Sequence, residues 1–179
     1  MKRLGLIITC LFVNFTLFAQ EGVCFRDLSY HQALEVAKAE KKLLFVDCYT
    51  SWCGPCQQMA KEVFSQKEAG DYFNSRFVCV KYDMEKGEGK KLDKQWDIQA
   101  YPTFMIIRPD GEIQHIIVGG GVLDRFIEQV ERGLNKKSSF GYLNKRYEQG
   151  KITKKEMFSY VRALREAYKT EKADEVKKE

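Results

Sequence analysis

Ser51-Trp52-Cys53-Gly54-Pro55-Cys56 contains two cysteines separated by two residues, and the elements on either side of it can be predicted from it outward. It lies between a continuous apolar run of strand length, residues 43–49, and a segment of helix-forming residues, 57–64, that carries an apolar stripe. This order of strand, short turn, CxxC and helix places Cys53 at a helix N-terminus. There the unpaired backbone N–H groups and the helix dipole favour a thiolate. Pro55 fits the first helical turn, because its missing N–H would have no partner there.

Two other interpretations of the cysteine pair remain open, and both are weaker. A structural zinc ion needs about four ligands at suitable spacing. The sequence has no second CxxC, and its two histidines, His31 and His115, are isolated from each other, so no metal site is expected. A permanent disulfide is also conceivable, but a bridge that encloses two residues restricts the unfolded chain much less than one that closes a long loop. A redox-active pair is therefore the preferred interpretation.

Thiol–disulfide exchange needs an accessible thiolate, a second thiol that resolves the mixed disulfide, and a route for protons. Cys53, at the exposed end of the helix, is the expected nucleophile. Cys56 lies one turn further in, shielded, and is expected to resolve the mixed disulfide. Asp47 is unexpected inside an apolar strand, because a buried carboxylate is costly unless it is paired or protonated. It is either a satisfied structural residue or a proton acceptor for Cys56. The chemistry requires no cofactor.

Three segments carry a resemblance to a known family: Phe45-Val46-Asp47, Trp52-Cys53-Gly54-Pro55-Cys56 and Ala100-Tyr101-Pro102-Thr103. Together they closely resemble the thioredoxin family, over roughly residues 24–135. The resemblance implies an α/β thioredoxin fold, with a central mixed β-sheet flanked by helices. It also favours the proton-acceptor role of Asp47, because family members carry a buried Asp six residues before the first cysteine. Lys81 is positioned like the family's strand lysine that can lie near this acid.

The same resemblance implies which residues contact the substrate. Pro102 matches the family's cis-proline, which packs beside the disulfide where neighbouring backbone can pair with the substrate chain. Tyr101 departs from the isoleucine usual in cytosolic thioredoxins and looks like the disulfide-isomerase branch. Trp52 is expected to form a partly exposed cover over the cysteines, although simple packing would also explain it. Gly54 and Pro55, between the cysteines, complete the expected substrate-binding surface.

The hydrophobic pattern predicts the remaining elements without reference to any family. Helices are expected over residues 29–40, with Ser29 as N-cap, and over 57–64, 66–74, 90–95 and 122–134. Strands are expected over 43–49, 77–82, 103–107 and 112–118, the last two joined by a Pro-Asp-Gly turn. Strands that alternate with helices and end in a hairpin and a helix imply a mixed sheet covered on both faces.

The first 19 residues have the layout of a secretory signal peptide. A basic head at residues 1–3 precedes an almost wholly apolar run, 4–18, and a small residue, Ala19, at the cut. We expect cleavage after Ala19 and export to the periplasm or a similar compartment. A retained membrane anchor is the alternative, but the run is shorter than the roughly 20 apolar residues of a spanning helix.

The part of the chain that follows the leader divides into a thioredoxin-like domain, 20–135, and a helical extension, 136–179. The first carries 15 basic and 18 acidic side chains, and the second carries 13 and 7. No block of like charges indicates nucleic-acid binding, and the basic extension is expected to be a solvated helical surface. The chain stops without a helix stop signal, which leaves open whether it is cut short.

Two helices are expected in the extension, over residues 140–149 and 153–175, separated by a break at Gly150. The second has an apolar face at helical spacing, made of Met157, Tyr160, Val161, Leu164, Ala167 and Tyr168. Such a face is expected to pack inside the protein. A docking surface for a protein partner, or the start of a helical repeat, is the open alternative.

Five of the six cysteines remain once Cys10 leaves with the leader, and an odd number argues against complete pairing. Cys48 and Cys79 lie in apolar strands and are expected to act as small hydrophobes. Cys24 has no assigned role.

These observations predict an exported thiol–disulfide oxidoreductase that contributes to cell redox homeostasis. Because Gly54-Pro55 resembles the same pair in the reducing members, we expect the protein to reduce disulfides between the cysteine residues of exported proteins. A membrane-embedded donor is expected to supply the electrons. Oxidase or isomerase activity is the alternative. A scaffold that binds a partner through its C-terminal helices is a hypothesis of another class.

Overall fold

The computed structural model describes residues 21–135 and 137–178, so the predicted leader and its cleavage site lie outside the described residues. Within these two ranges, no helix is long and apolar enough to cross a membrane. The elements, in chain order, are α1 (Tyr30–Glu40), β1 (Leu43–Tyr49), α2 (Gly54–Gln58), the π-helical turn η1 (Met59–Val63), α3 (Lys67–Arg76), β2 (Phe77–Asp83), α4 (Gly89–Trp96), β3 (Thr103–Ile107), β4 (Ile113–Val118), α5 (Leu123–Leu134), α6 (Phe140–Glu148), α7 (Lys154–Glu166) and α8 (Thr170–Val176).

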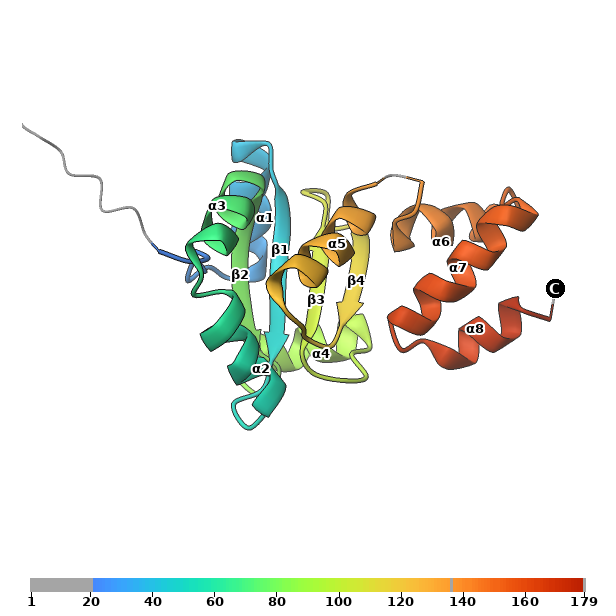
Figure 1. Ribbon diagram of the computed structural model, residues 1–179. Helices are drawn as coiled ribbons and strands as arrows, with labels where there is room; N and C mark the ends of the chain where they lie inside the picture. Colours follow the sequence, from blue (N-terminus) through green and yellow to red (C-terminus); the bar gives the residue numbers. More distant parts are fainter. Residues whose placement is uncertain (1–20, 136, 179) are drawn as a thin grey trace, which may run out of the picture.

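Four strands form one mixed sheet in the order β2-β1-β3-β4 (Figure 1). β1 runs parallel to β2 and antiparallel to β3, and β3 and β4 form the antiparallel hairpin. The predicted fold class, a mixed sheet covered by helices, is confirmed. The predicted N-cap is confirmed as well, because the Ser29 hydroxyl accepts a hydrogen bond from the Gln32 N–H at 3.3 Å.

The alternation of side chains along β1 decides where the one buried acid of this strand points. Val46 and Cys48 face the layer of α1 and α4, whereas Phe45 faces the layer of η1, which continues α2, and of α3 and α5. Because successive side chains on a strand point to opposite faces, Asp47 shares the face of Phe45. Asp47 therefore lies on the same side of the sheet as the helix that begins at the cysteine pair.

A cluster of phenylalanine rings fills the core on this side of the sheet. Phe45 is fully buried at its centre, with its ring 4.7 Å from that of Phe73 and 5.8 Å from that of Phe104. Phe104 in turn lies 4.7 Å from Phe126 on α5. Aromatic burial of this extent dominates the stability of a small core. The cluster includes Phe64, which directly follows η1, and Phe126 of α5, so it joins the end of the helical segment after the CxxC motif and α5 to the sheet.

The extension forms three helices, so the prediction of two was wrong. The second predicted helix breaks after Glu166, where Tyr168 adopts a left-handed conformation with φ of 58° and the Lys169 N–H donates to the Leu164 carbonyl. Tyr168 is 55% exposed and therefore not part of the apolar face, whereas Ala167 packs against the core of the domain. Packing against the sheet thus ends α7 where helical periodicity alone would continue it.

The rest of the apolar face is used inside the extension, as predicted. Tyr160 and Leu164 of α7 are fully buried and pack with Leu143 of α6 and with Ala173 and Val176 of α8. Figure 1 places these helices beyond β4, and α6 and α7 pack against that strand. The extension therefore covers the edge of the sheet, which would otherwise offer unpaired backbone groups to another chain.

His115 of β4 lies at this junction between the sheet and the extension. It is 3% exposed, and its Nδ1 accepts a hydrogen bond from the Phe140 N–H at 3.2 Å. Burial lowers the pKa of His115 to about 4, and the positive charge of Arg132 acts in the same direction. The neutral imidazole is thus the form that the folded protein holds.

We expect the stability of the protein to fall by up to about 3 kcal/mol as the pH decreases from about 6.5 to about 4, because of His115. In this window the unfolded chain binds a proton at His115 that the folded chain does not bind. The His115→Asn variant should lack this part of the pH dependence in guanidinium unfolding, and the exposed His31→Asn variant should keep it. Identical pH profiles for His115→Asn and the unsubstituted protein would contradict the assignment.

Candidate active site

The two cysteines of the CxxC motif form a disulfide at the start of α2. Their Cα atoms are 5.3 Å apart. Cys53 is the N-cap residue, and its Sγ accepts a hydrogen bond from the Cys56 backbone N–H at 3.1 Å. Pro55 stands in the first turn, as predicted. This N–H would donate a stronger hydrogen bond to a Cys53 thiolate than to the sulfur of the disulfide, because a charge on the acceptor strengthens the hydrogen bond.

The expected difference in exposure between the two cysteines is absent. Cys56 is 6% exposed and therefore shielded, as predicted, but Cys53 is only 3% exposed, so the prediction of an exposed Cys53 was wrong for this oxidised state. Part of the reason is that bonded sulfurs touch and cover each other. What distinguishes the two residues is position, since Cys53 precedes the helix and Cys56 lies inside its first turn.

Asp47 is buried beneath this helix. It is 5% exposed, and its Oδ1 has no hydrogen-bond partner among the described residues. Burial raises the pKa of Asp47 to about 7, although the positive charge of Lys81 acts in the opposite direction. The two residues are register partners on β1 and β2. A carboxyl group with this pKa can both accept and return a proton near neutral pH.

A cavity of about 160 Å³ brings together the three residues predicted to handle protons, Asp47, Cys56 and Lys81. Lys81 is exposed, so the cavity leads from the buried acid toward solvent. Thr50 also lines it, and its buried Oγ1 has no partner among the described residues. Thr50 was not predicted from the sequence, where the available signal was a polar residue immediately before the motif. This arrangement can carry a proton between the Cys56 sulfur and the surface.

The loop before β3 lies on the other side of the motif. The peptide bond between Tyr101 and Pro102 is cis, which is the isomer that the resemblance implies. The Tyr101 ring meets the Trp52 ring edge to face at 6.3 Å, and the Tyr101 hydroxyl donates to Asp93 at 2.5 Å. Asp93 was not predicted from the sequence either, because it lies on α4, eight positions before its partner.

Trp52 and Gly54 form the outer surface of the motif. Trp52 is 67% exposed, which makes it one of the few large hydrophobic side chains open to solvent. Gly54 is exposed, and a Cβ added to it would meet nothing within 4 Å. An exposed aromatic side chain beside an open backbone is a typical contact surface for another polypeptide.

The remaining cysteines do not join the site. Cys48 and Cys79 are buried and unpaired, and burial raises the pKa of both thiols, to about 12 for Cys79. Both therefore behave as small hydrophobic residues, as predicted. Cys24 is half-buried and is also free. No group of three or more potential metal ligands occurs among residues 21–135 and 137–178.

Comparison with known proteins places this geometry in a family. A family model described as thioredoxin-like matches residues 26–109. Thioredoxin-1 of Drosophila melanogaster is 34% identical over 79 residues, which are 44% of this chain and 67% of that protein. Thioredoxin H1 of Arabidopsis thaliana is 35% identical over 104 residues, which are 56% of this chain and 85% of that protein. Other matched thioredoxins are longer, and the chain spans 48% and 58% of two from rice.

Among solved structures, a Bacteroides thetaiotaomicron protein proposed to be a disulphide-isomerase superposes with a TM-score of 0.60. It is 45% identical, and the match covers 64% of this chain and 95% of that protein.

Proposed function

Because this chain belongs to the thioredoxin family, we propose that it is an exported protein that reduces disulfides in other exported proteins. As a thioredoxin-like disulfide oxidoreductase with a CxxC pair, it exchanges electrons between Cys53-Cys56 and the cysteines of a substrate. The observation that carries the proposal is the disulfide at the helix N-terminus, with the acid Asp47 and Cys56 lining one cavity.

The exchange has two steps. The Cys53 thiolate attacks one sulfur of the substrate disulfide, which forms a mixed disulfide and releases the other substrate sulfur as a thiolate. The Cys56 thiol then loses its proton to Asp47 and attacks Cys53, which releases the second substrate sulfur. Two electrons pass to the substrate, and the protein is left with the Cys53–Cys56 disulfide seen here.

The reducing direction is supported by the residues between the cysteines, Gly54 and Pro55, which the reducing members of the family share. We expect the Cys53–Cys56 pair to have a reduction potential near that of thioredoxin, which is about −270 mV. Equilibration of the protein with glutathione or dithiothreitol buffers, followed by thiol trapping and mass spectrometry, measures it. A potential above about −180 mV would instead support an oxidase or isomerase.

Disulfide isomerisation is the second candidate, because the 45% identical structural relative is proposed to be a disulphide-isomerase and Tyr101 departs from the cytosolic pattern. Refolding of a scrambled multi-disulfide protein distinguishes the two activities. A reductase yields reduced chains, whereas an isomerase yields native disulfides.

Export is supported by the basic head, the apolar run and Ala19 at the N-terminus. A protein that works outside the cytosol also needs a membrane-embedded donor, since no soluble reductant is assured there. N-terminal sequencing of the protein from its own host tests the proposal. A chain that begins at Gln20 in an extracytoplasmic fraction is expected, and a cytosolic chain that retains residues 1–19 would contradict export.

A further inference from the structure

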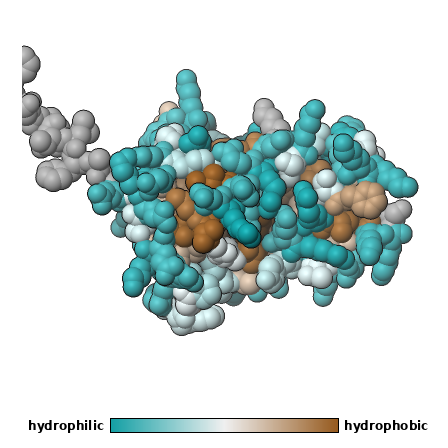
Figure 2. Space-filling view, viewed as in Figure 1, coloured by the Kyte–Doolittle hydropathy of each residue, from teal (hydrophilic) through white to brown (hydrophobic). Residues whose placement is uncertain are grey.

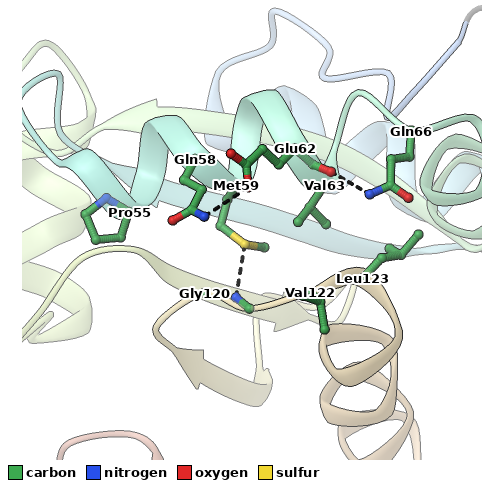
Figure 3. Close-up of a pocket in the computed structure, with 10 residues that line it drawn as sticks. Pro55, Gln58, Met59, Glu62, Val63, Gln66, Gly120, Val122 and Leu123 are labelled. Atoms are coloured by element: carbon green, nitrogen blue, oxygen red, sulfur yellow. Dashed lines mark hydrogen bonds between the residues drawn. The ribbon is translucent and has the colours of Figure 1, made fainter.

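A second and larger cavity, of about 460 Å³, begins beside the CxxC motif and lies between η1 and the start of α5 (Figure 3). Pro55 stands at one end of it. Met59 points across it toward Gly120, whereas Glu62 lies beside Gln58 on the helix side and Val122 lies on the α5 side. Figure 2 shows hydrophobic surface between the α2–α3 side and α5, bordered by hydrophilic side chains. The proton-transfer steps use none of the residues that line it, and the predicted substrate-binding surface shares only Pro55 with it.

Met59 and Val122 belong to the apolar part of this cavity, and they differ in how far they are exposed. Met59 lies at the bottom of the cavity and is 2% exposed, whereas Val122 is 66% exposed and is one of four large hydrophobic side chains that the described part of the chain leaves open to solvent. The loop at residues 119–121 approaches Met59 closely, and a Cβ added to Gly120 would lie 2.9 Å from the Met59 side chain. An apolar side chain of another polypeptide would complete the contact between Met59 and Val122.

The polar part of the cavity contains a hydrogen-bond donor, the Gly121 N–H, and one carboxylate, that of Glu62. The Gly121 N–H donates to the Met59 sulfur at 3.4 Å, and because a thioether is a weak acceptor, this donor would prefer a carbonyl oxygen. Glu62 accepts a hydrogen bond from the Gln58 amide at 2.9 Å, and in the described part of the chain it forms no ion pair. The cavity thus presents an exposed carboxylate without a cation.

We propose that this cavity, which we call the η1–α5 subsite, binds the substrate polypeptide on one side of its reactive cysteine. An apolar side chain lies against Met59 and Val122, a backbone carbonyl accepts the Gly121 N–H, and a lysine or arginine lies opposite Glu62. The assignment rests on the proposed function, because only a substrate held at Cys53 brings its neighbouring residues here.

Helix geometry gives the spacing of the cation from the substrate cysteine. Glu62 follows Cys53 by nine residues, which is about 13 Å along a helix that rises 1.5 Å per residue. An extended substrate chain covers this distance in about four residues, at about 3.3 Å each. The preferred substrates therefore carry lysine or arginine about four positions from the reactive cysteine, with an apolar residue between them.

The test uses the reduced protein in single turnover with short peptides. Each peptide has one cysteine, held as a mixed disulfide with 5-thio-2-nitrobenzoate, whose release is followed by absorbance. Cys53 attacks the peptide sulfur, the nitrothiophenolate leaves, and Cys56 then frees the peptide thiol. The peptides carry Lys or Glu at three, four or five positions from the cysteine, on either side, and Leu or Ala between. Every rate is divided by the same variant's rate with a small aromatic disulfide, so that altered exchange chemistry cancels.

We expect the lysine peptide to react about two- to fivefold faster than its glutamate partner at low salt, and this preference to weaken in 1 M salt. Glu62→Gln should remove the preference and Glu62→Lys should invert it. Glu68→Lys, at an exposed glutamate on α3 outside the cavity, should leave it unchanged. Val122→Ser should remove the preference for Leu over Ala, and because Val122 is the N-cap of α5, serine is compatible with the fold.

A Lys/Glu ratio that Glu62→Lys does not alter, while the small disulfide is still reduced, would overturn the η1–α5 subsite and leave the proposed function intact. Failure of the unsubstituted protein to reduce any peptide or the small disulfide would overturn the function and the subsite together.

Discussion

Replacement of Cys53 by serine is expected to abolish disulfide reduction, with a loss of at least about a thousandfold in the rate. Cys53 is the residue placed to attack, and the free cysteines that the structure describes are either buried or lie outside the site. Loss of the nucleophile removes the first step completely, and a serine hydroxyl is not ionised at neutral pH. Reduction of insulin by dithiothreitol, followed by turbidity, measures the effect.

Cys56→Ala should also stop turnover, but at a different step. Its Cys53 still attacks, so the variant should accumulate as a mixed disulfide with its substrate, which mass spectrometry of alkylated protein detects. Cys24→Ser is the matched control, because Cys24 is free and half-buried. Insulin reduction that survives in Cys53→Ser would contradict the assignment of Cys53 as the nucleophile. A mixed disulfide between the substrate and Cys56 in this variant would contradict it as well. In the native host, the Cys56→Ala variant also identifies the substrates.

Replacement of Asp47 by asparagine is expected to have the second largest effect, and to act on both stability and rate. The pKa of Asp47 is about 7 in the folded protein against a usual 3.8. Between these two values the folded chain binds a proton that the unfolded chain has lost, so stability falls as the pH rises through this window. The shift corresponds to about 4 kcal/mol of destabilisation above pH 7 that is absent below pH 4.

Asp47→Asn should therefore lack this decrease when the oxidised protein is unfolded in guanidinium chloride at pH 5 and at pH 9. Its single-turnover release of substrate should slow by about a hundredfold and lose the inflection near pH 7, since no group remains to accept the Cys56 proton. Asp71→Asn, at an exposed carboxylate of α3, is the control. A pH profile of release that is unchanged in Asp47→Asn would show that Asp47 is only a structural residue.

Asp47 and His115 act on stability in opposite directions over overlapping ranges of pH. The protein gains stability at Asp47 as the pH falls from 7 to 4 and loses it at His115 as the pH falls from 6.5 to 4. A nearly flat profile of the unsubstituted protein would therefore hide two large contributions. Only the single variants separate them.

The amino-acid pattern alone was enough to predict the order and kind of the elements of the thioredoxin-like domain and to identify the cysteine pair. These follow from local physics: the periodicity of apolar residues distinguishes strand from helix, and a CxxC before a helix places Cys53 at its N-terminus. The elements of the domain begin and end within a few residues of their predicted bounds. Asp47 could be singled out because an acid in an apolar strand is costly wherever that strand packs.

How residues far apart in the chain meet could not be predicted from the pattern and follows from the packing of the elements. The register between β1 and β2 sets Lys81 beside Asp47, and the close approach of loop 119–121 to η1 creates the cavity that Glu62 and Val122 share. The burial of both sulfurs and the break at Tyr168 also depend on contacts with other elements. Periodicity reports which face of an element is apolar, but the free energy of such contacts depends on what the fold packs against that face.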